Sequence, residues 1–257
     1  MESTLQAQQS QQAQGGVNAS VLKIIAITGM TLDHIGIAFS SHLPLWAQIA
    51  LFAFGGLTFP IMAFLMVEGY QRTSNFKRYA LRLLTFALIS LIPFMWGLRM
   101  RSLNVMFTLL LGLLTLYLYD HMKARAAFWL VFVGFTLATL FMDWSLMGVP
   151  MVLLYRTLQG KWKRLIIPIL LPISMMIVST VAALVFMPEQ VSGTFPSLAY
   201  ALVGCTLTVP LLANYNGQRG LPLKYLFYAY YPGHLIVLAL VRGLLFQDWK
   251  FKKLSNK

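Results

Sequence analysis

The sequence predicts an all-α, polytopic integral membrane protein with about nine (8–10) transmembrane helices around an intramembrane polar cavity. The first observation is compositional: of 257 residues, 58% are hydrophobic and 11% are charged, and the mean hydropathy is +0.71. Such a chain has too few polar side chains to cover a soluble globule. The second observation is that the apolar residues form long runs separated by short, mostly basic loops.

Each apolar run is a candidate helix. Most are long enough to cross about 30 Å of hydrocarbon, but the fifth and sixth are short. Asp143-Trp144-Ser145 separates these two with a polar break that could cap the next helix. Basic clusters flank the pair at both ends, so an even number of crossings fits there. The nine runs are 21–41, 45–70, 78–97, 103–121, 126–141, 146–158, 165–187, 195–213 and 223–246.

The two ends of the chain differ from the apolar middle. Residues 1–19 are rich in Gln, Ser, Ala and Gly and predict a disordered tail. They lack the basic region of a signal peptide, so we expect the first span to be retained. Residues 20–246 form the expected single transmembrane domain, and residues 247–257 are a basic carboxyl-terminal tail.

The loops predict an orientation. With the amino terminus in the cytoplasm, the inner loops hold most of the 20 Lys and Arg residues, and the outer loops hold Arg99 and Arg101, as the positive-inside rule requires. A nine-span count leaves Arg242 and the lysines of the tail outside, which weakens the span number more than the orientation. Because the cations cluster between apolar runs and form no single stripe, nucleic acid is not an expected partner. The lone Cys205 excludes an intrachain disulfide.

Asp33 and His34 are two adjacent ionisable residues inside the first apolar run. His34 lies roughly 20 Å along the span, counted from Val21. A charged side chain at mid-depth costs on the order of 3 kcal/mol, so such residues face protein or water and mark functional sites. His34 is a candidate general base because imidazole titrates near neutral pH. Asp33 could orient the imidazole or, since adjacent helix residues diverge, another group.

His234 lies in the last run, directly after Pro232-Gly233, and is roughly 14 Å deep if that helix also enters from the inside. It could polarise a carbonyl or protonate a leaving group. For both histidines the alternative is a purely structural hydrogen bond to a neighbouring helix.

Basic residues at the start of the third span form a candidate phosphate site. Arg78 and Arg82 are four residues apart and share a helix face, and guanidinium groups suit phosphate. Arg72 and Lys77 could join them, although ordinary positive-inside topology explains these two as well.

Three further polar residues have structural alternatives. Glu68 precedes Arg72 by four residues, the favourable order for an intrahelical ion pair. Asp143 lies at an outer boundary where helix capping is inexpensive, and Asn104 could cap the fourth span.

The sequence resembles the TraX family from about residue 21 to 241. The motifs that carry the resemblance are Lys23-Ile-Ile-Ala-Ile, Leu32-Asp33-His34-Ile35-Gly36, Phe59-Pro60, Arg78-Tyr-Ala-Leu-Arg82, Asn104-Val-Met-Phe107-Thr108, Asp143-Trp-Ser-Leu-Met-Gly148 and Tyr231-Pro232-x-His234. Glu68-Gly69 is a weaker match. The family is named for a conjugation protein that acetylates the amino terminus of pilin, and it resembles the transmembrane acyltransferases.

The resemblance implies a bacterial cytoplasmic (inner) membrane acetyltransferase that uses acetyl-CoA and needs no metal. His34, Asp33 and His234 would be catalytic, Arg78, Arg82, Arg72 and Lys77 would hold CoA, and Asn104, Tyr231, Glu68 and Asp143 would support them. The acceptor would be pilin or another surface component, such as a glycan. Transfer through a ternary complex and through acetyl-histidine both fit.

Two other classes of protein are compatible with these residues. A bis-histidine haem protein could use His34 and His234 as ligands and would show a Soret band. A proton-coupled transporter could use Asp33, His34 and Glu68 as a relay, and its substrate uptake would need no acetyl-CoA.

Overall fold

The computed structural model describes residues 15–222 and 224–246. Residues 1–14 of the expected amino-terminal tail and the whole expected tail 247–257 lie outside the described residues. Within the described ranges the chain is helical, and β pairing is confined to two isolated bridges, Val17 with Tyr215 and Leu103 with Met142. The all-α prediction is therefore confirmed.

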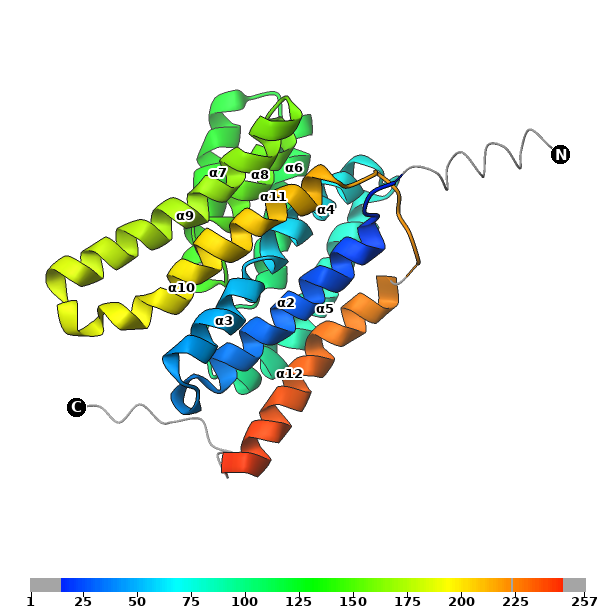
Figure 1. Cartoon of the computed structure of the whole chain (residues 1–257). Coiled ribbons are helices and arrows are strands. Elements are labelled where there is room, and N and C mark those ends of the chain that lie inside the picture. The colour runs from blue at the N-terminus through cyan, green and yellow to red at the C-terminus, as the bar shows by residue number, and fades with distance from the viewer. Residues whose placement is uncertain (1–14, 223, 247–257) are drawn as a thin grey trace.

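The helices follow one another with short connections (Figure 1). Three 3₁₀ turns, Ser40–His42, Thr139–Phe141 and Pro188–Thr194, and one π-helical turn, Tyr200–Cys205, connect or extend them. The α-helices are α2 (Ala19–Ala38), α3 (Leu45–Gly55), α4 (Thr58–Gln71), α5 (Phe76–Leu98), α6 (Val105–His121), α7 (Arg125–Ala138), α8 (Gly148–Thr157), α9 (Lys161–Phe186), α10 (Phe195–Ala199), α11 (Thr206–Ala213) and α12 (Lys224–Phe246).

Six described segments are long and apolar enough to cross a membrane. Val105–His121 and Arg125–Phe141 are two further apolar segments that are shorter, and α8 is shorter still, with 10 residues. The protein is thus a multi-pass helical membrane protein by the length and composition of its helices, but the expected count of nine spans is not confirmed. The six segments are Ala19–Ala38, Leu45–Gln71, Phe76–Leu98, Lys161–Phe186, Pro188–Ala213 and Leu226–Phe246.

Asparagine side chains begin three of the helices. Asn18 accepts a hydrogen bond from the amide of Val21, and Asn75 accepts one from the amide of Arg78. Asn104 does the same for α6 through the amide of Met106. Each cap satisfies a backbone donor that the first helical turn leaves unpaired.

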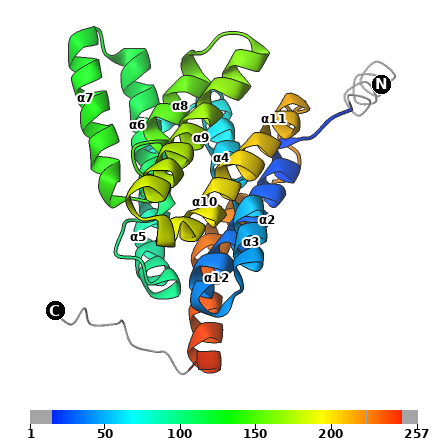
Figure 2. The same cartoon turned by 60° about the vertical axis from the view of Figure 1, so that its left-hand side comes forward.

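Glycines let the central helices approach closely. A Cβ at Gly29 of α2 would lie 2.6 Å from the carbonyl oxygen of Phe54, at the end of α3. A Cβ at Gly56, in the break between α3 and α4, would collide with the carbonyl oxygen of Tyr200, and one at Gly204 would collide with that of Ala53. Small residues permit such backbone contact between membrane helices. Figure 2 shows α7 at the left-hand edge of the molecule, apart from α2 and α3.

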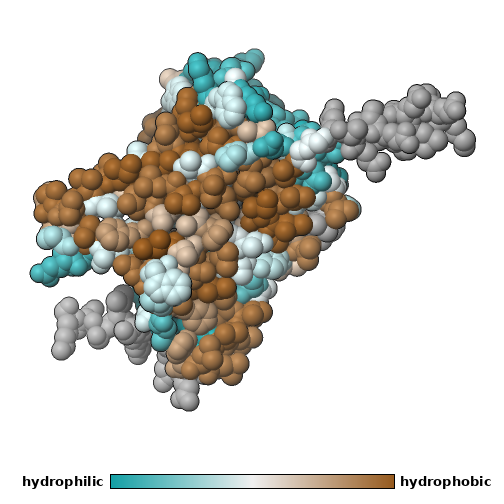
Figure 3. Space-filling view, viewed as in Figure 1, coloured by the Kyte–Doolittle hydropathy of each residue, from teal (hydrophilic) through white to brown (hydrophobic). Residues whose placement is uncertain are grey.

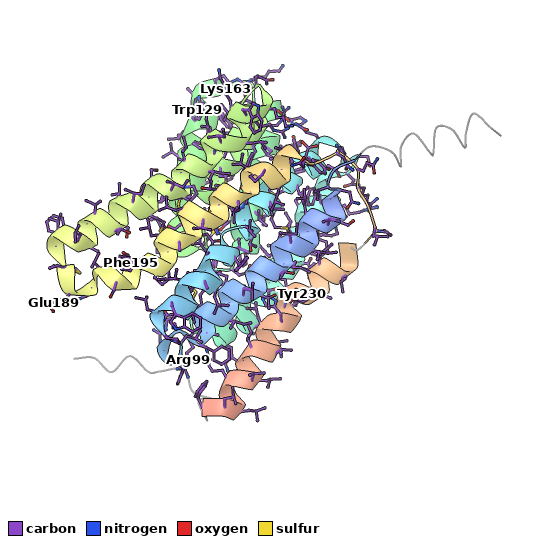
Figure 4. All side chains as sticks on the ribbon, viewed as in Figure 1. Arg99, Trp129, Lys163, Glu189, Phe195 and Tyr230 are labelled. Atoms are coloured by element: carbon purple, nitrogen blue, oxygen red, sulfur yellow. The ribbon has the colours of Figure 1, made fainter. Side chains whose placement is uncertain are left out.

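The two ends of the molecule differ in chemistry. Glu68 pairs with Arg164, Asp120 pairs with Arg156, and Arg72 donates to the Gly217 carbonyl. These contacts lie where the connections α4–α5, α6–α7, α8–α9 and α11–α12 gather at one end, which we call the basic end. The opposite end holds the connections α2–α3, α5–α6 and α9–α10. Lys163 and Glu189 mark these two ends in Figure 4. A broad hydrophobic surface lies between hydrophilic margins in Figure 3, as a membrane-embedded surface requires.

Candidate functional site

His34 of α2 and His234 of α12 form a direct hydrogen bond. The Nδ1 atom of His34 lies 2.7 Å from the Nε2 atom of His234. The two rings are nearly coplanar, with an interplanar angle of 6°. Both side chains are buried, with exposed fractions of 4% and 8%. The structure therefore brings together the two histidines that sequence analysis singled out.

The neighbours of the pair define where its protons lie. The Nδ1 atom of His234 is 2.9 Å from the carbonyl oxygen of Tyr230, which can only accept. Two neutral rings must then carry a proton on each Nδ1, and His34 donates to the Nε2 atom of His234. The Nε2 atom of His34 is left with a free lone pair, and the described residues give it no hydrogen-bond partner. The pair thus presents one basic nitrogen.

Aromatic residues of α12 hold the pair in place. The Tyr230 ring stacks on His234 at a centroid distance of 5.1 Å, and its hydroxyl lies 2.6 Å from the Thr31 hydroxyl. Because Thr31 donates to the Ile27 carbonyl, Tyr230 donates to Thr31. Tyr231 lies 6.4 Å from His34 and 5.7 Å from His234 between ring centroids. Figure 4 shows Tyr230 on α12, where that helix runs beside α2.

Asp33 points away from the histidine that follows it. Its carboxyl group packs against Gly55, where an added Cβ would lie 2.6 Å from the Asp33 Cβ and 2.8 Å from Oδ1. The partner of the His34 Nδ1 atom is His234 and no carboxylate. Asp33 therefore does not orient the imidazole through its Nδ1 atom, and its role in orienting another group stays a prediction.

Asp143 lies in a strained turn before α8. Its Oδ1 atom accepts the Trp144 amide at 2.9 Å. Trp144 and Leu146 both have positive φ angles, 60° and 58°, a conformation that is costly for side chains with a Cβ and clusters at functional sites. Burial raises the pKa of Asp143 to about 6, against the opposing effect of the Trp144 amide. This carboxyl group therefore exchanges its proton near neutral pH.

Two cavities share part of their lining, and His34 lines one of them. Cavity A, of about 210 Å³, begins near Lys23, Gly69 and Tyr79 and includes Tyr231. Cavity B, of about 400 Å³, includes Asp33, His34, Ser102, Asp143 and Tyr200. Cavity A is mostly apolar, so the expected single polar cavity is not confirmed. The two cavities share four lining residues: Met30, Thr58, Phe59 and Val105.

The candidate phosphate-binding cations lie at the basic end but outside the lining of cavity A. Arg72 binds Glu68 and the carbonyl oxygen of Gly217. Lys77 and Arg78 are exposed, and the guanidinium of Arg82 lies 5.5 Å from the centre of the Tyr79 ring. Of these four residues, Arg82 contacts a residue that lines the cavity.

Glu68 and Asn104 have local structural partners. Glu68 binds Arg72 at 3.1 Å and Arg164 at 2.9 Å, at the basic end and apart from the histidine pair. Asn104 caps α6 and also donates to the Ala87 carbonyl at 2.8 Å. A proton relay from Asp33 and His34 to Glu68 therefore lacks contacts that would connect it.

The spacing of the histidine pair bears on the haem alternative. Imidazole ligands bind metals at about 2 Å, so an ion between two of them separates their nitrogens by about 4 Å. The 2.7 Å between His34 and His234 leaves no room for iron between these nitrogens. No group of three or more metal-binding side chains occurs in the part of the chain that the structure describes.

Thr31, Tyr230 and Tyr200 also belong to the site, although the sequence alone did not predict roles for them. Thr31 lies three residues before His34, and Tyr230 four residues before His234, so helical spacing could have placed each beside its histidine. Tyr200 lies in the π-helical turn and lines cavity B. Such turns are rare and often mark functional sites, but this sequence offers no signal for one.

The comparisons with known proteins agree on one family. The family model described as TraX protein matches residues 18–242. A probable fimbrial assembly protein FimC, serogroup H1, of Dichelobacter nodosus is 29% identical over 245 residues, which cover 89% of this chain and 97% of the relative. No solved structure matches. Because the family model matches most of the chain, including both histidines, this chain belongs to the TraX family.

Proposed function

We propose that this protein is a membrane acetyltransferase that moves an acetyl group from acetyl-CoA to an acceptor at or across the membrane, with His34 as general base. The observation that supports this most is the free Nε2 atom of His34, because a buried, oriented imidazole with an open lone pair can take a proton. Cavity B, which His34 lines, would take the acceptor, and cavity A, which shares four lining residues with cavity B, would take the donor.

The transfer follows from this arrangement. An acceptor amine or hydroxyl in cavity B attacks the thioester carbonyl carbon, while the Nε2 atom of His34 removes the acceptor's proton. The tetrahedral intermediate then expels the thiolate of CoA as the C–S bond breaks, and the imidazolium returns the proton to that sulfur. An acetyl-histidine route would use the same Nε2 atom as the nucleophile.

His234 is best explained as a positioning residue. Both of its ring nitrogens have partners, His34 and the Tyr230 carbonyl. It therefore fixes the tautomer and the direction of the His34 ring, as a second group commonly does for a catalytic base. A direct role in polarising the thioester would require the two rings to separate.

The basic end would face the cytoplasm, where acetyl-CoA is made, with the amino terminus inside and the protein in the bacterial inner membrane. Arg78 and Arg82 lie at the basic end, where Arg82 contacts Tyr79 on the wall of cavity A, and would attract the phosphates of CoA. The relative named as a fimbrial assembly protein favours pilin as the acceptor, and a surface glycan hydroxyl is the alternative.

Membranes that contain the protein, incubated with acetyl-CoA and candidate acceptors, provide the test. We expect mass spectrometry to find one added acetyl group on a pilin or a surface glycan, and its loss with His34→Gln. Transfer at the wild-type rate by His34→Gln membranes would contradict the role of His34. The absence of any acetylated acceptor with the wild-type protein, across both classes, would contradict the proposed activity.

A further inference from the structure

Lys23 is a cation on the wall of a mainly apolar cavity, and we propose that it binds the phosphate of the acyl donor, whose slender arm occupies cavity A. This inference rests on the proposed function and deepens it. It assigns the donor to one cavity and names an anion-binding residue that lies on its wall.

The surroundings of Lys23 lack a compensating charge. Its ammonium lies 5.6 Å from the centre of the Phe227 ring, and no described acid pairs with it. The guanidinium of Arg219 lies near enough to repel its charge. A half-buried cation next to a second cation favours an anionic ligand, because only an anion lowers the energy of both.

Lys23 also lies near the amino terminus of α2. The helix begins at Ala19, so Lys23 lies one turn inside it at the basic end. The partial positive charge of the helix amino terminus adds to that of Lys23 and Arg219. Tyr79 and Tyr228 also line cavity A and bring two hydroxyl groups. Lys23, Tyr79 and Tyr228 thus bring polar groups to the wall of the mostly apolar cavity A.

The inner part of cavity A suits an uncharged, flexible chain. Four methionines line it, Met30, Met62, Met66 and Met106, and their unbranched side chains adapt to a ligand. From Lys23 to His34 the helix rises roughly 16 Å. A phosphate held at Lys23 would therefore place the far end of an extended arm beside the histidine pair.

The proposed role of Lys23 differs from that of the two arginines of α5. Arg78 and Arg82 do not line cavity A, so they can raise the local concentration of an anion without contacting it inside the channel. Lys23 does line it. The ligand class is an amphiphile with a phosphate head and a narrow chain, which describes both acyl-CoA and a phospholipid.

The test measures donor binding apart from chemistry. The purified full chain in nanodiscs of phosphatidylcholine is titrated with CoA, which has no acetyl group to transfer. We expect Lys23→Gln to weaken CoA binding about tenfold, as loss of one charge-assisted contact predicts, and Lys23→Arg to restore most of it. The control is Lys163→Gln, an exposed lysine at the same end that lines neither cavity A nor cavity B. It should bind CoA like the wild type.

A labelling experiment gives a second readout that does not depend on Lys23. Met62→Cys places a thiol in cavity A, and Ser102→Cys places one in cavity B, while the native Cys205 is buried. CoA should protect position 62 from a maleimide and leave position 102 reactive. The same labelling with phosphatidylglycerol in the nanodisc, without CoA, shows whether a phospholipid fills cavity A.

The outcomes separate the two hypotheses. Equal CoA affinity and an equal KM for acetyl-CoA in the wild type and Lys23→Gln, with no protection at position 62, would overturn the inference and leave the proposed activity standing. Protection by phosphatidylglycerol and not by CoA would also overturn it. CoA binding that depends on Lys23, without acetyl transfer to any acceptor, would support the channel and contradict the proposed function.

Discussion

The Nδ1 atom of His34 lies 2.7 Å from the Nε2 atom of His234, across 200 residues of chain. The other ring nitrogen of His234, Nδ1, forms a hydrogen bond with the carbonyl oxygen of Tyr230. Together these two contacts give the imidazoles unequal roles: one ring is held at both nitrogens, and the other has a free lone pair. Substitutions at the two positions should therefore have different kinetic effects.

We expect His34→Gln to lower the rate of acetyl transfer by 10²-fold or more, roughly what a general base contributes. His234→Gln should cost less, about tenfold, because its amide oxygen can still accept the His34 Nδ1 proton. His234→Ala should fall between them. The measurement is kcat with saturating acetyl-CoA in membranes that contain equal amounts of folded protein.

The pH profile separates positioning from catalysis. If His234 orients His34, His234→Gln should shift the acidic limb of kcat against pH, since the charged form of His34 loses an imidazole partner. Identical profiles for the wild type and His234→Gln, with kcat alone reduced, would mean that His234 acts by packing only.

Much of the fold could be predicted from the sequence because apolar length and polar caps act locally. The second span was expected at 45–70, and the structure has helical segments over Leu45–Gln71. The count of nine crossings stays a prediction, because α6, α7 and α8 are short apolar helices whose length does not decide whether they span.

The candidate site was predicted in its parts but not in its contacts. Asp33, His34 and His234 were found because charged groups are costly in hydrocarbon. Their pairing depends on how α2 and α12 pack, which periodicity does not encode. Asp33 was considered as a partner of His34, yet neighbouring helical residues diverge, and the carboxyl group packs on Gly55 instead.

The raised pKa of Asp143 should make the stability of the folded protein depend on pH. Burial raises the pKa of Asp143 to about 6 in the folded protein, above about 3.9 for an unfolded aspartate. The unfolded state therefore loses its proton first as the pH rises, and stability should fall by about 2 kcal/mol between pH 4 and pH 7. The measurement is the thermal midpoint in detergent across that range.

Asp143→Asn is the matched control for that profile, because an amide oxygen can still accept the Trp144 amide but cannot ionise. We expect its thermal midpoint to change less with pH than that of the wild type. A profile unchanged by Asp143→Asn would assign the titration to another group.

Asn104 should prove structural. Its side chain caps α6 and donates to the Ala87 carbonyl of α5, so Asn104→Ala removes both contacts and should cost about 1–3 kcal/mol of stability. Asn104→Asp keeps the cap and loses the donor, so its stability should lie between those of the wild type and Asn104→Ala. Acetyl transfer per folded molecule should stay within about twofold of wild type. A large loss of kcat in a fully folded Asn104→Ala protein would show a catalytic role.

Glu68 distinguishes an enzyme from a proton-coupled transporter. It bridges Arg72 and Arg164 at the basic end, so Glu68→Gln should lower stability by about 1 kcal/mol and leave kcat within a few fold. A transporter that used Glu68 as a relay would lose proton-driven uptake altogether. Flux in proteoliposomes, measured beside acetyl transfer, tells these outcomes apart.

Gly56 tests the close contact on which the walls of cavity B depend. Its amide backbone meets the π-helical turn so closely that a Cβ would collide with the Tyr200 carbonyl oxygen. Gly56→Ala must push this turn away from α3 and α4, and Tyr200 lines cavity B. We expect little folded protein, or a folded protein with strongly reduced transfer.

Gly134→Ala is the control, because a Cβ there meets nothing within 4 Å, and an alanine inside α7 should stabilise the helix by about 0.5–1 kcal/mol. Full activity and a wild-type thermal midpoint for Gly56→Ala would mean that the turn and α4 lie farther apart than this packing requires.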